Sequence, residues 1–159
     1  MSEKVVQVVL TSSNWISGSV SNNANYFIDW NAILKPNVPY KFHWSYIGGT
    51  NIYDGTKPAF VEFDFTKEVY LAGSTGGAQT SNIVGFLIPV VITPSTNTCF
   101  LTANLNTNEP VWMASRPHRN LFNVKIVDST GALWTDNAGT PAVPAGWTII
   151  IHFTEAEQS

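Results

Sequence analysis

The sequence has few charged residues. Only 12% of its 159 residues are Asp, Glu, Lys or Arg, and the net charge is −3, whereas an average soluble domain carries about 25% charged residues. The eight cations are scattered, and only Arg116 and Arg119 lie close together. No basic run exists to follow a phosphate backbone, which argues against nucleic-acid binding. A surface so poor in charge is typical of a protein that packs against neighbours.

Cysteine and long apolar runs are also scarce. The single cysteine, Cys99, excludes an intramolecular disulfide and, within an apolar run, predicts a buried, inert thiol. The absence of disulfides fits assembly in a reducing cytoplasm. No segment approaches the roughly 18 apolar residues that a membrane helix needs, so no membrane span is expected.

Catalytic motifs are missing. A nucleophilic triad needs a base close to a hydroxyl or thiol, and the only histidines, His43, His118 and His152, are dispersed along the chain. No serine lies in a Gly-x-Ser-x-Gly motif. We therefore expect no catalytic residue and no enzymatic activity.

Metal and cofactor motifs are equally weak. The sequence has no Cys-x-x-Cys and no His-x-His, the spacings at which zinc or copper ligands occur. Glu62 and Asp64 share one strand face, and one hypothesis is that they bind a calcium ion together with Asp54. The simpler interpretation is the solvent-facing side of an antiparallel strand. The Gly-rich segment Ala72–Gly77 lacks the Gly-Lys-Ser/Thr ending of a phosphate-binding loop, so no cofactor is expected.

Short runs of β-branched and aromatic residues alternate with clusters of Gly, Pro, Asn and Ser, and no helical period is present. Eight runs predict strands: Lys4–Ser12, Asn25–Leu34, Val38–Ile47, Ala59–Phe65, Asn82–Ile92, Thr98–Ala114 with an Asn-rich interruption, Leu121–Asp128 and Trp147–Thr154. Loops of mixed length favour a Greek-key sandwich over an up-and-down barrel. We predict one all-β domain over residues 1–159, a single eight-stranded antiparallel jelly-roll sandwich.

Two of these runs carry more specific expectations. In Val38–Ile47 the aromatic residues alternate with polar ones, which predicts one buried face made by Tyr40, Phe42, Trp44 and Tyr46. The run Asn82–Ile92 is almost continuously apolar, which predicts a strand covered on both faces.

Six tryptophans are a high number for this length. Trp30 and Trp44 lie on predicted strands and are expected in the core. Trp15 and Trp134 lie at predicted loops or strand ends, which makes them our candidates for exposed interface anchors, since aromatic anchors dominate interface energetics. Core placement stays open for both.

The order of these segments resembles the single-jelly-roll penton and minor capsid proteins of large nucleocytoplasmic DNA viruses. The resemblance rests on the aromatic strand Asn25–Ile28 after an Asn/Ser-rich loop, the strand Tyr40–Ile47 before a glycine turn, the stretch Arg116–Gly131, and the final strand Trp147–Phe153. It implies strands B to I in two sheets, BIDG and CHEF. Lys4–Ser12 then pairs near Trp147–Thr154, and Asn25–Leu34 near Leu121–Asp128.

The resemblance also implies a role. Such proteins form homopentamers at icosahedral vertices, or cement the lattice of the major double-jelly-roll capsid protein together with other minor capsid proteins. The expected location is the virion capsid, assembled in the host cytoplasm. The short flanks of the predicted domain favour a penton over a cementing protein. The alternatives are a minor capsid, cement or fibre-type protein of the same family, and a carbohydrate-binding β-sandwich module. A cupin-type enzyme is disfavoured because the histidines are dispersed.

Overall fold

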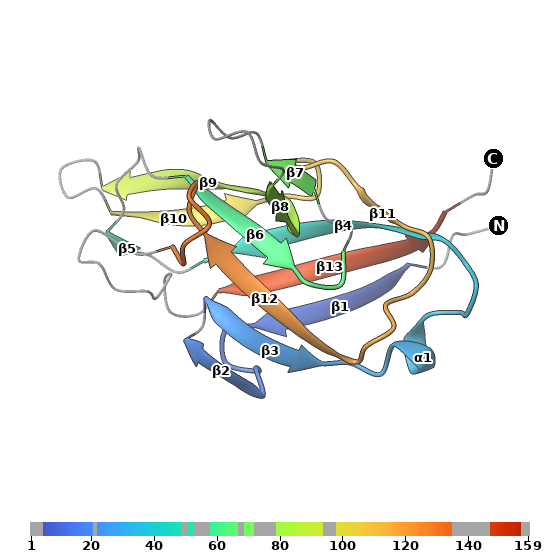
Figure 1. Ribbon diagram of the computed structural model, residues 1–159. Helices are drawn as coiled ribbons and strands as arrows, with labels where there is room; N and C mark the ends of the chain where they lie inside the picture. Colours follow the sequence, from blue (N-terminus) through green and yellow to red (C-terminus); the bar gives the residue numbers. More distant parts are fainter. Residues whose placement is uncertain are drawn as a thin grey trace.

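A computed structural model describes residues 5–20, 22–48, 51–52, 58–66, 69–71, 79–93, 98–134 and 147–156. Over these residues the chain is all-β, and the strands form an antiparallel sheet that curls over itself (Figure 1). Within the same residues there is no helix long and apolar enough to cross a bilayer.

The described elements follow one another in a simple order. They are β1 (Val6–Thr11), β2 (Ser17–Val20), β3 (Asn23–Phe27), α1 (Trp30–Ile33), β4 (Tyr40–Ile47), β5 (Asn51–Ile52), β6 (Ala59–Phe63), β7 (Val69–Leu71), β8 (Gln79–Ser81), β9 (Ile83–Thr93), β10 (Thr98–Ala103), β11 (Val111–Met113), β12 (Leu121–Val127) and β13 (Thr148–Glu155).

The main sheet has the strand order β1-β13-β4-β10-β9-β6-β12-β3-β2. Strand β9 joins its two halves, because Ile83–Leu87 pairs with β6 while Ile88–Thr93 pairs with β10. Strand β11 adds to β4 and β5 to β10, and β7 pairs with β8 separately. In Figure 1 the half with β12, β6 and β3 lies in front of the half with β1, β13 and β4.

The two predicted strand pairings are observed. Strand β1 pairs with β13, from Val6 opposite Phe153 to Thr11 opposite Thr148. Strand β3 pairs with β12, where Tyr26 lies opposite Phe122. Both pairs join segments that are distant in the sequence, so they determine how the sheet closes.

The predicted strand Asn25–Leu34 is wrong in its second half. The strand ends at Phe27, and helix α1 begins at Trp30 because the Asp29 carboxylate accepts a hydrogen bond from the Asn31 backbone N–H at 3.2 Å, the interaction of a helix N-cap. The Trp30 indole is fully buried and donates to the Arg119 carbonyl at 3.0 Å.

Other boundaries also differ from expectation. The predicted run Thr98–Ala114 forms two strands, β10 and β11, separated by a turn in which the Asn104 side chain accepts from the Asn106 N–H at 2.8 Å. Strands β2, β7 and β8 lie in or beside segments predicted as loops. Each has only three or four residues, which is too short for an alternating apolar pattern to predict a strand, so these strands are defined by their backbone pairing.

The expectation that β9 is covered on both faces is also wrong. Phe86, Ile88 and Val90 alternate along the strand and are each about two-fifths exposed, whereas Val84 and Leu87 are buried. No other described element covers the outer side of β9. An apolar run therefore does not reveal whether a second layer is present.

Asn108 covers the edge of β9 opposite β6, at Phe86, just before pairing with β10 begins at Ile88. Its amide accepts from the Phe86 N–H at 3.0 Å and donates to the Phe86 carbonyl at 3.1 Å, as a neighbouring strand would. The contact requires glycine at the preceding position, because Gly85 has φ +156° and a Cβ there would overlap the Asn108 side chain.

The core lies between the two halves of the sheet and is rich in aromatic rings. The predicted face of β4 is confirmed, since Tyr40, Phe42, Trp44 and Tyr46 are all buried. Phe42 and Trp44 contact Phe63 of β6, with ring centroids 6.0 and 6.3 Å apart. Such pairs contribute about 0.5–1.5 kcal/mol each beyond their burial.

Two buried tyrosines differ in their hydrogen bonding. The Tyr26 hydroxyl donates to the Thr11 carbonyl at 2.8 Å, whereas the Tyr46 hydroxyl is buried without a hydrogen-bond partner among the described residues. Burial raises the pKa of both hydroxyls above the usual tyrosine value. The same substitution should therefore affect stability differently at the two positions.

We expect Tyr26→Phe to lower the free energy of unfolding by about 1 kcal/mol, because it removes a satisfied hydrogen bond. Tyr46→Phe should leave it unchanged or raise it by up to about 1 kcal/mol, because the lost hydroxyl has no partner. Urea unfolding at pH 7 measures both changes. An equal loss at both positions would contradict the assignment.

The raised pKa values of the Tyr26 and Tyr46 hydroxyls make the free energy of unfolding depend on pH. Because both pKa values are raised in the folded state, the stability from the neutral hydroxyls is complete below pH about 10 and is lost progressively above it. Tyr46→Phe should flatten this alkaline decline relative to wild type when unfolding is repeated between pH 8 and 11.

Candidate functional site

The two tryptophans predicted as exposed anchors lie in different environments. Trp134 is only 1% exposed, so its prediction as an exposed interface anchor is wrong. Its backbone is held by two hydrogen bonds: the Trp134 N–H donates to the Ile126 carbonyl at 2.9 Å, and the Asn22 side chain donates to the Trp134 carbonyl at 2.8 Å. Trp15 is partly buried and packs against the core, so it keeps some surface for a contact.

The structure brings two of the three histidines together. His43 on β4 and His152 on β13 are direct cross-strand partners, while His118 lies in the loop between β11 and β12. The Gln7 side chain contacts Nδ1 of His152 at 3.2 Å, and Nδ1 of His43 lies 3.2 Å from the Leu105 carbonyl.

Within the residues that the structure describes, no group of three or more His, Cys, Asp or Glu side chains could hold a metal ion. The two described carboxylates of the calcium hypothesis have other partners. Glu62 accepts from the Ser81 hydroxyl at 2.7 Å, and Asp64 pairs with Arg119 at 3.5 Å. The third, Asp54, lies outside the described residues, as do Ala72–Gly77 and the side chain of Cys99.

Most of one outer side of the sheet carries no Asp, Glu, Lys or Arg, and Lys41 of β4 marks where this part ends. We define the uncharged face as the outward side chains of β4 from His43 onward and their neighbours on β1, β13, β10 and the second part of β9: Gln7, Val9, Thr11, His43, Ser45, Ile47, Ile88, Val90, Phe100, Thr102, Thr148, Ile150 and His152. One row of direct partners crosses five strands: Thr11, Thr148, Ile47, Thr102 and Ile88. Ile47, at the centre of this row, is 59% exposed.

Charge begins at the border of the uncharged face. Lys41 lies two residues before His43 on β4, and its ammonium group is 5.8 Å from the ring centroid of the exposed Trp112, within cation–π range. The predicted alternation of Val38–Ile47 gave the outward residues of one strand. The face as a whole needed the register of five strands, which the sequence alone does not provide.

The opposite half of the sheet has a second exposed surface. Phe27 of β3 and Leu121 of β12 are direct partners and are both exposed. Beside them the Asn123 amide donates to the side-chain oxygens of Asn23 and Asn25 at 2.9 and 3.0 Å. The molecule thus presents two chemically different sheet faces.

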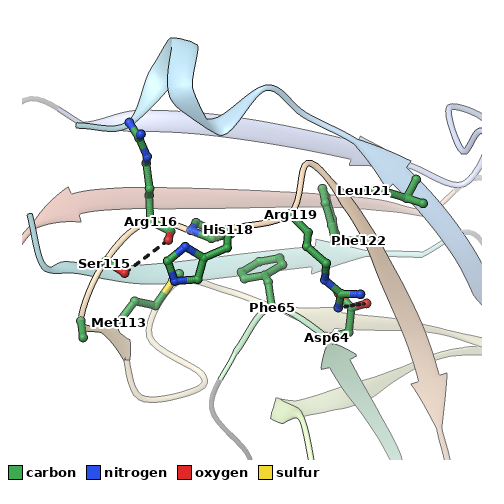
Figure 2. A pocket seen from close by; sticks show the side chains of 11 residues that line it. Asp64, Phe65, Met113, Ser115, Arg116, His118, Arg119, Leu121 and Phe122 are labelled. Carbon is green, nitrogen blue, oxygen red and sulfur yellow. Dashed lines mark hydrogen bonds and ion pairs between the residues drawn. The ribbon is translucent and has the colours of Figure 1, made fainter. Parts of the chain in front are cut away.

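A pocket of about 280 Å³ lies at one end of the curled sheet (Figure 2). Its apolar lining includes Phe65, Met113 and Phe122, and its polar lining includes Asp64, Ser115, His118 and Arg119. In Figure 2 the Phe65 ring lies between His118 and the Asp64–Arg119 pair, while the Arg116 side chain extends away toward α1. The sequence prediction missed this pocket because Asp64 and Arg119 are far apart in the chain.

Hydrogen bonds hold the pocket loop against the α1 segment. The Arg116 guanidinium donates to the Leu34 carbonyl at 2.9 Å, and the Ile28 N–H donates to the Asn120 carbonyl at 2.9 Å. With the Trp30 indole bound to Arg119, these contacts anchor the loop at three points. These contacts fix the position of the loop that lines the pocket.

The comparisons with known proteins do not assign the chain to a family. No protein-family model matches the chain, and no curated protein matches it at a significant level. Function must be argued from the two sheet faces and the pocket.

Substitution of the two tryptophans should separate core from surface. Trp134→Ala should lower the free energy of unfolding by about 3–5 kcal/mol, the usual cost of emptying a buried aromatic site. Trp15→Ala should cost clearly less, because part of its ring is already in solvent.

Thermal and urea unfolding of both variants measure the difference. The comparison would contradict the burial of Trp134 if both substitutions had equally small effects on stability while both reduced self-association.

Proposed function

We propose that the chain is a structural viral capsid protein that acts through contacts with neighbouring subunits and not through catalysis. In its most specific form, the proposal is that the chain is a penton protein that forms homopentamers at icosahedral vertices. Its partners would then be other copies of itself, the major double-jelly-roll capsid protein and other minor capsid proteins. Its location would be the virion capsid after assembly in the host cytoplasm.

The strand order supports an eight-stranded jelly roll. If β1, β3, β4, β6, β9, β10, β12 and β13 are strands B to I, the sequence β1-β13-β4-β10 corresponds to BIDG. The sequence β9-β6-β12-β3 then corresponds to CHEF in reverse. The short strands β2, β5, β7, β8 and β11 would be additions in the connections.

The uncharged face is the observation that carries the assembly role. Contiguous exposed apolar surface on a soluble protein marks contact sites, and the centres of protein interfaces are depleted in charged residues. Here the uncharged face presents apolar side chains, uncharged polar side chains and two histidines from five neighbouring strands, with Lys41 at its border. Burial of this face against another subunit would desolvate no carboxylate, ammonium or guanidinium group.

Two different faces suit a ring. In a cyclic assembly above a dimer each subunit contributes two distinct surfaces, one to each neighbour. The uncharged face can serve as one surface, and the exposed Phe27–Leu121 pair with its asparagine group as the other.

The test is the mass of the protein in solution. We expect sedimentation velocity and native mass spectrometry to show five copies of the 17.4 kDa chain. Ile47→Asp places a charge in the middle of the uncharged face and should shift the protein to monomers, because an unpaired charge would have to be buried in the contact.

Ser129→Asp is the matched control, since it adds the same charge at an exposed turn outside both faces. Circular dichroism establishes that each variant is folded. A wild-type protein that stays monomeric and does not associate with particles would overturn the proposal. Association only with the larger capsid protein would favour a cement-type role instead of a pentamer.

A further inference from the structure

We propose that the pocket lined by Asp64, Phe65, His118 and Arg119 binds one pyranose ring of a carbohydrate. The proposal goes beyond the assembly role, because the pocket lies at the end of the curled sheet and not on the uncharged face. It rests on the size of the cavity, its rigid apolar wall and an incompletely satisfied carboxylate.

The carboxylate of Asp64 has spare acceptor capacity. Its Oδ2 makes only a long 3.5 Å pair with Arg119, and its Oδ1 is buried without a hydrogen-bond donor among the described residues. A buried acceptor without a partner is unfavourable, because the water that it lost is not replaced by another donor. Rotation about χ2, which is soft for aspartate, can turn either oxygen toward a hydroxyl donor in the pocket.

The neighbouring cationic and aromatic groups complete the chemistry. The Arg119 side chain is 75% exposed, so its remaining N–H groups can donate to a ligand oxygen, and the exposed His118 ring lies on the other side of Phe65. Phe65 is only partly buried and is fixed by edge contacts to Phe122 and Trp30, with centroids 5.2 and 5.4 Å apart.

A pyranose matches this arrangement. It has an apolar C–H face that can pack on Phe65, and hydroxyls around its edge that can donate to a carboxylate and accept from a guanidinium. The cavity of about 280 Å³ is near the lower limit of small-molecule sites, about 300 Å³, so it holds a single ring and not an extended chain. The Asp64–Arg119 pair is neutral overall, which favours an uncharged sugar.

Saturation-transfer NMR on the full chain tests the proposal. The probes are glucose, galactose, mannose and N-acetylglucosamine, with N-acetylneuraminic acid as the charged sugar, each at about 10 mM, which exceeds a millimolar Kd tenfold. We expect at least one neutral sugar to bind. Leu121 lines the pocket and also belongs to the second proposed contact surface, so a neighbouring subunit could cover the pocket. Binding is therefore measured on wild type and on Ile47→Asp, the variant expected to be monomeric.

Asp64→Asn and Arg119→Gln should each weaken binding about tenfold or more, the usual effect of removing a charge-assisted hydrogen bond. Glu109→Gln is the control, because it makes the same carboxylate-to-amide change at an exposed residue outside the pocket. Because two pocket variants are measured independently, the test remains valid if one of them fails to fold.

Three results would overturn the proposal: no signal from any neutral sugar, binding that neither pocket variant reduces, or binding confined to the charged sugar. Self-association is measured separately, so failure of the pocket leaves the assembly proposal standing, and the reverse also holds.

Discussion

The aromatic contact between the two halves of the curled sheet is the interaction on which the structure depends. Trp30 shows this most clearly, since its ring lies 5.5 Å from Phe122 on one half and 5.6 Å from Phe153 on the other. Among the described strands, β9 is the one that pairs with both halves, and the Tyr26 hydroxyl adds a hydrogen bond across to the Thr11 carbonyl. Elsewhere they are held together by packed side chains, whose contribution grows with the apolar area removed from water.

Because packed side chains inside the sheet hold its two halves together, the fold does not depend on charged residues. The side chains that hold the halves together point inward, and the outward side chains are left without a structural role in the core. On a protein that stays monomeric, charge at these positions favours solubility. On the uncharged face the outward positions instead carry aliphatic residues, threonine, serine, glutamine, phenylalanine and histidine, a composition that supports the proposed subunit contact.

The sequence allowed the strands to be predicted where alternation was regular, and failed where another interaction competed. The period-two pattern of Val38–Ile47 identified the buried face of β4. The run after Phe27 looked equally suited to a strand, but the Asp29 cap favours a helical turn. The apolar run at β9 could not reveal which side lacks a covering layer, and Trp134 is buried by contacts that residue type and position do not indicate.

The candidate sites were harder to predict than the strands, because each is assembled from segments that the fold brings together. The uncharged face depends on the register of five strands, and the pocket on the approach of the β11–β12 loop to the end of β6. The two sites place different demands on the chain. A sheet face is held by backbone pairing on both sides and suits a broad, flat contact. The β11–β12 loop at the end of the curled sheet is free of strand pairing and can hold separate polar groups around a cavity. The two proposed sites therefore draw on different parts of the fold, and they meet at Leu121, which lines the pocket and also belongs to the second proposed contact surface.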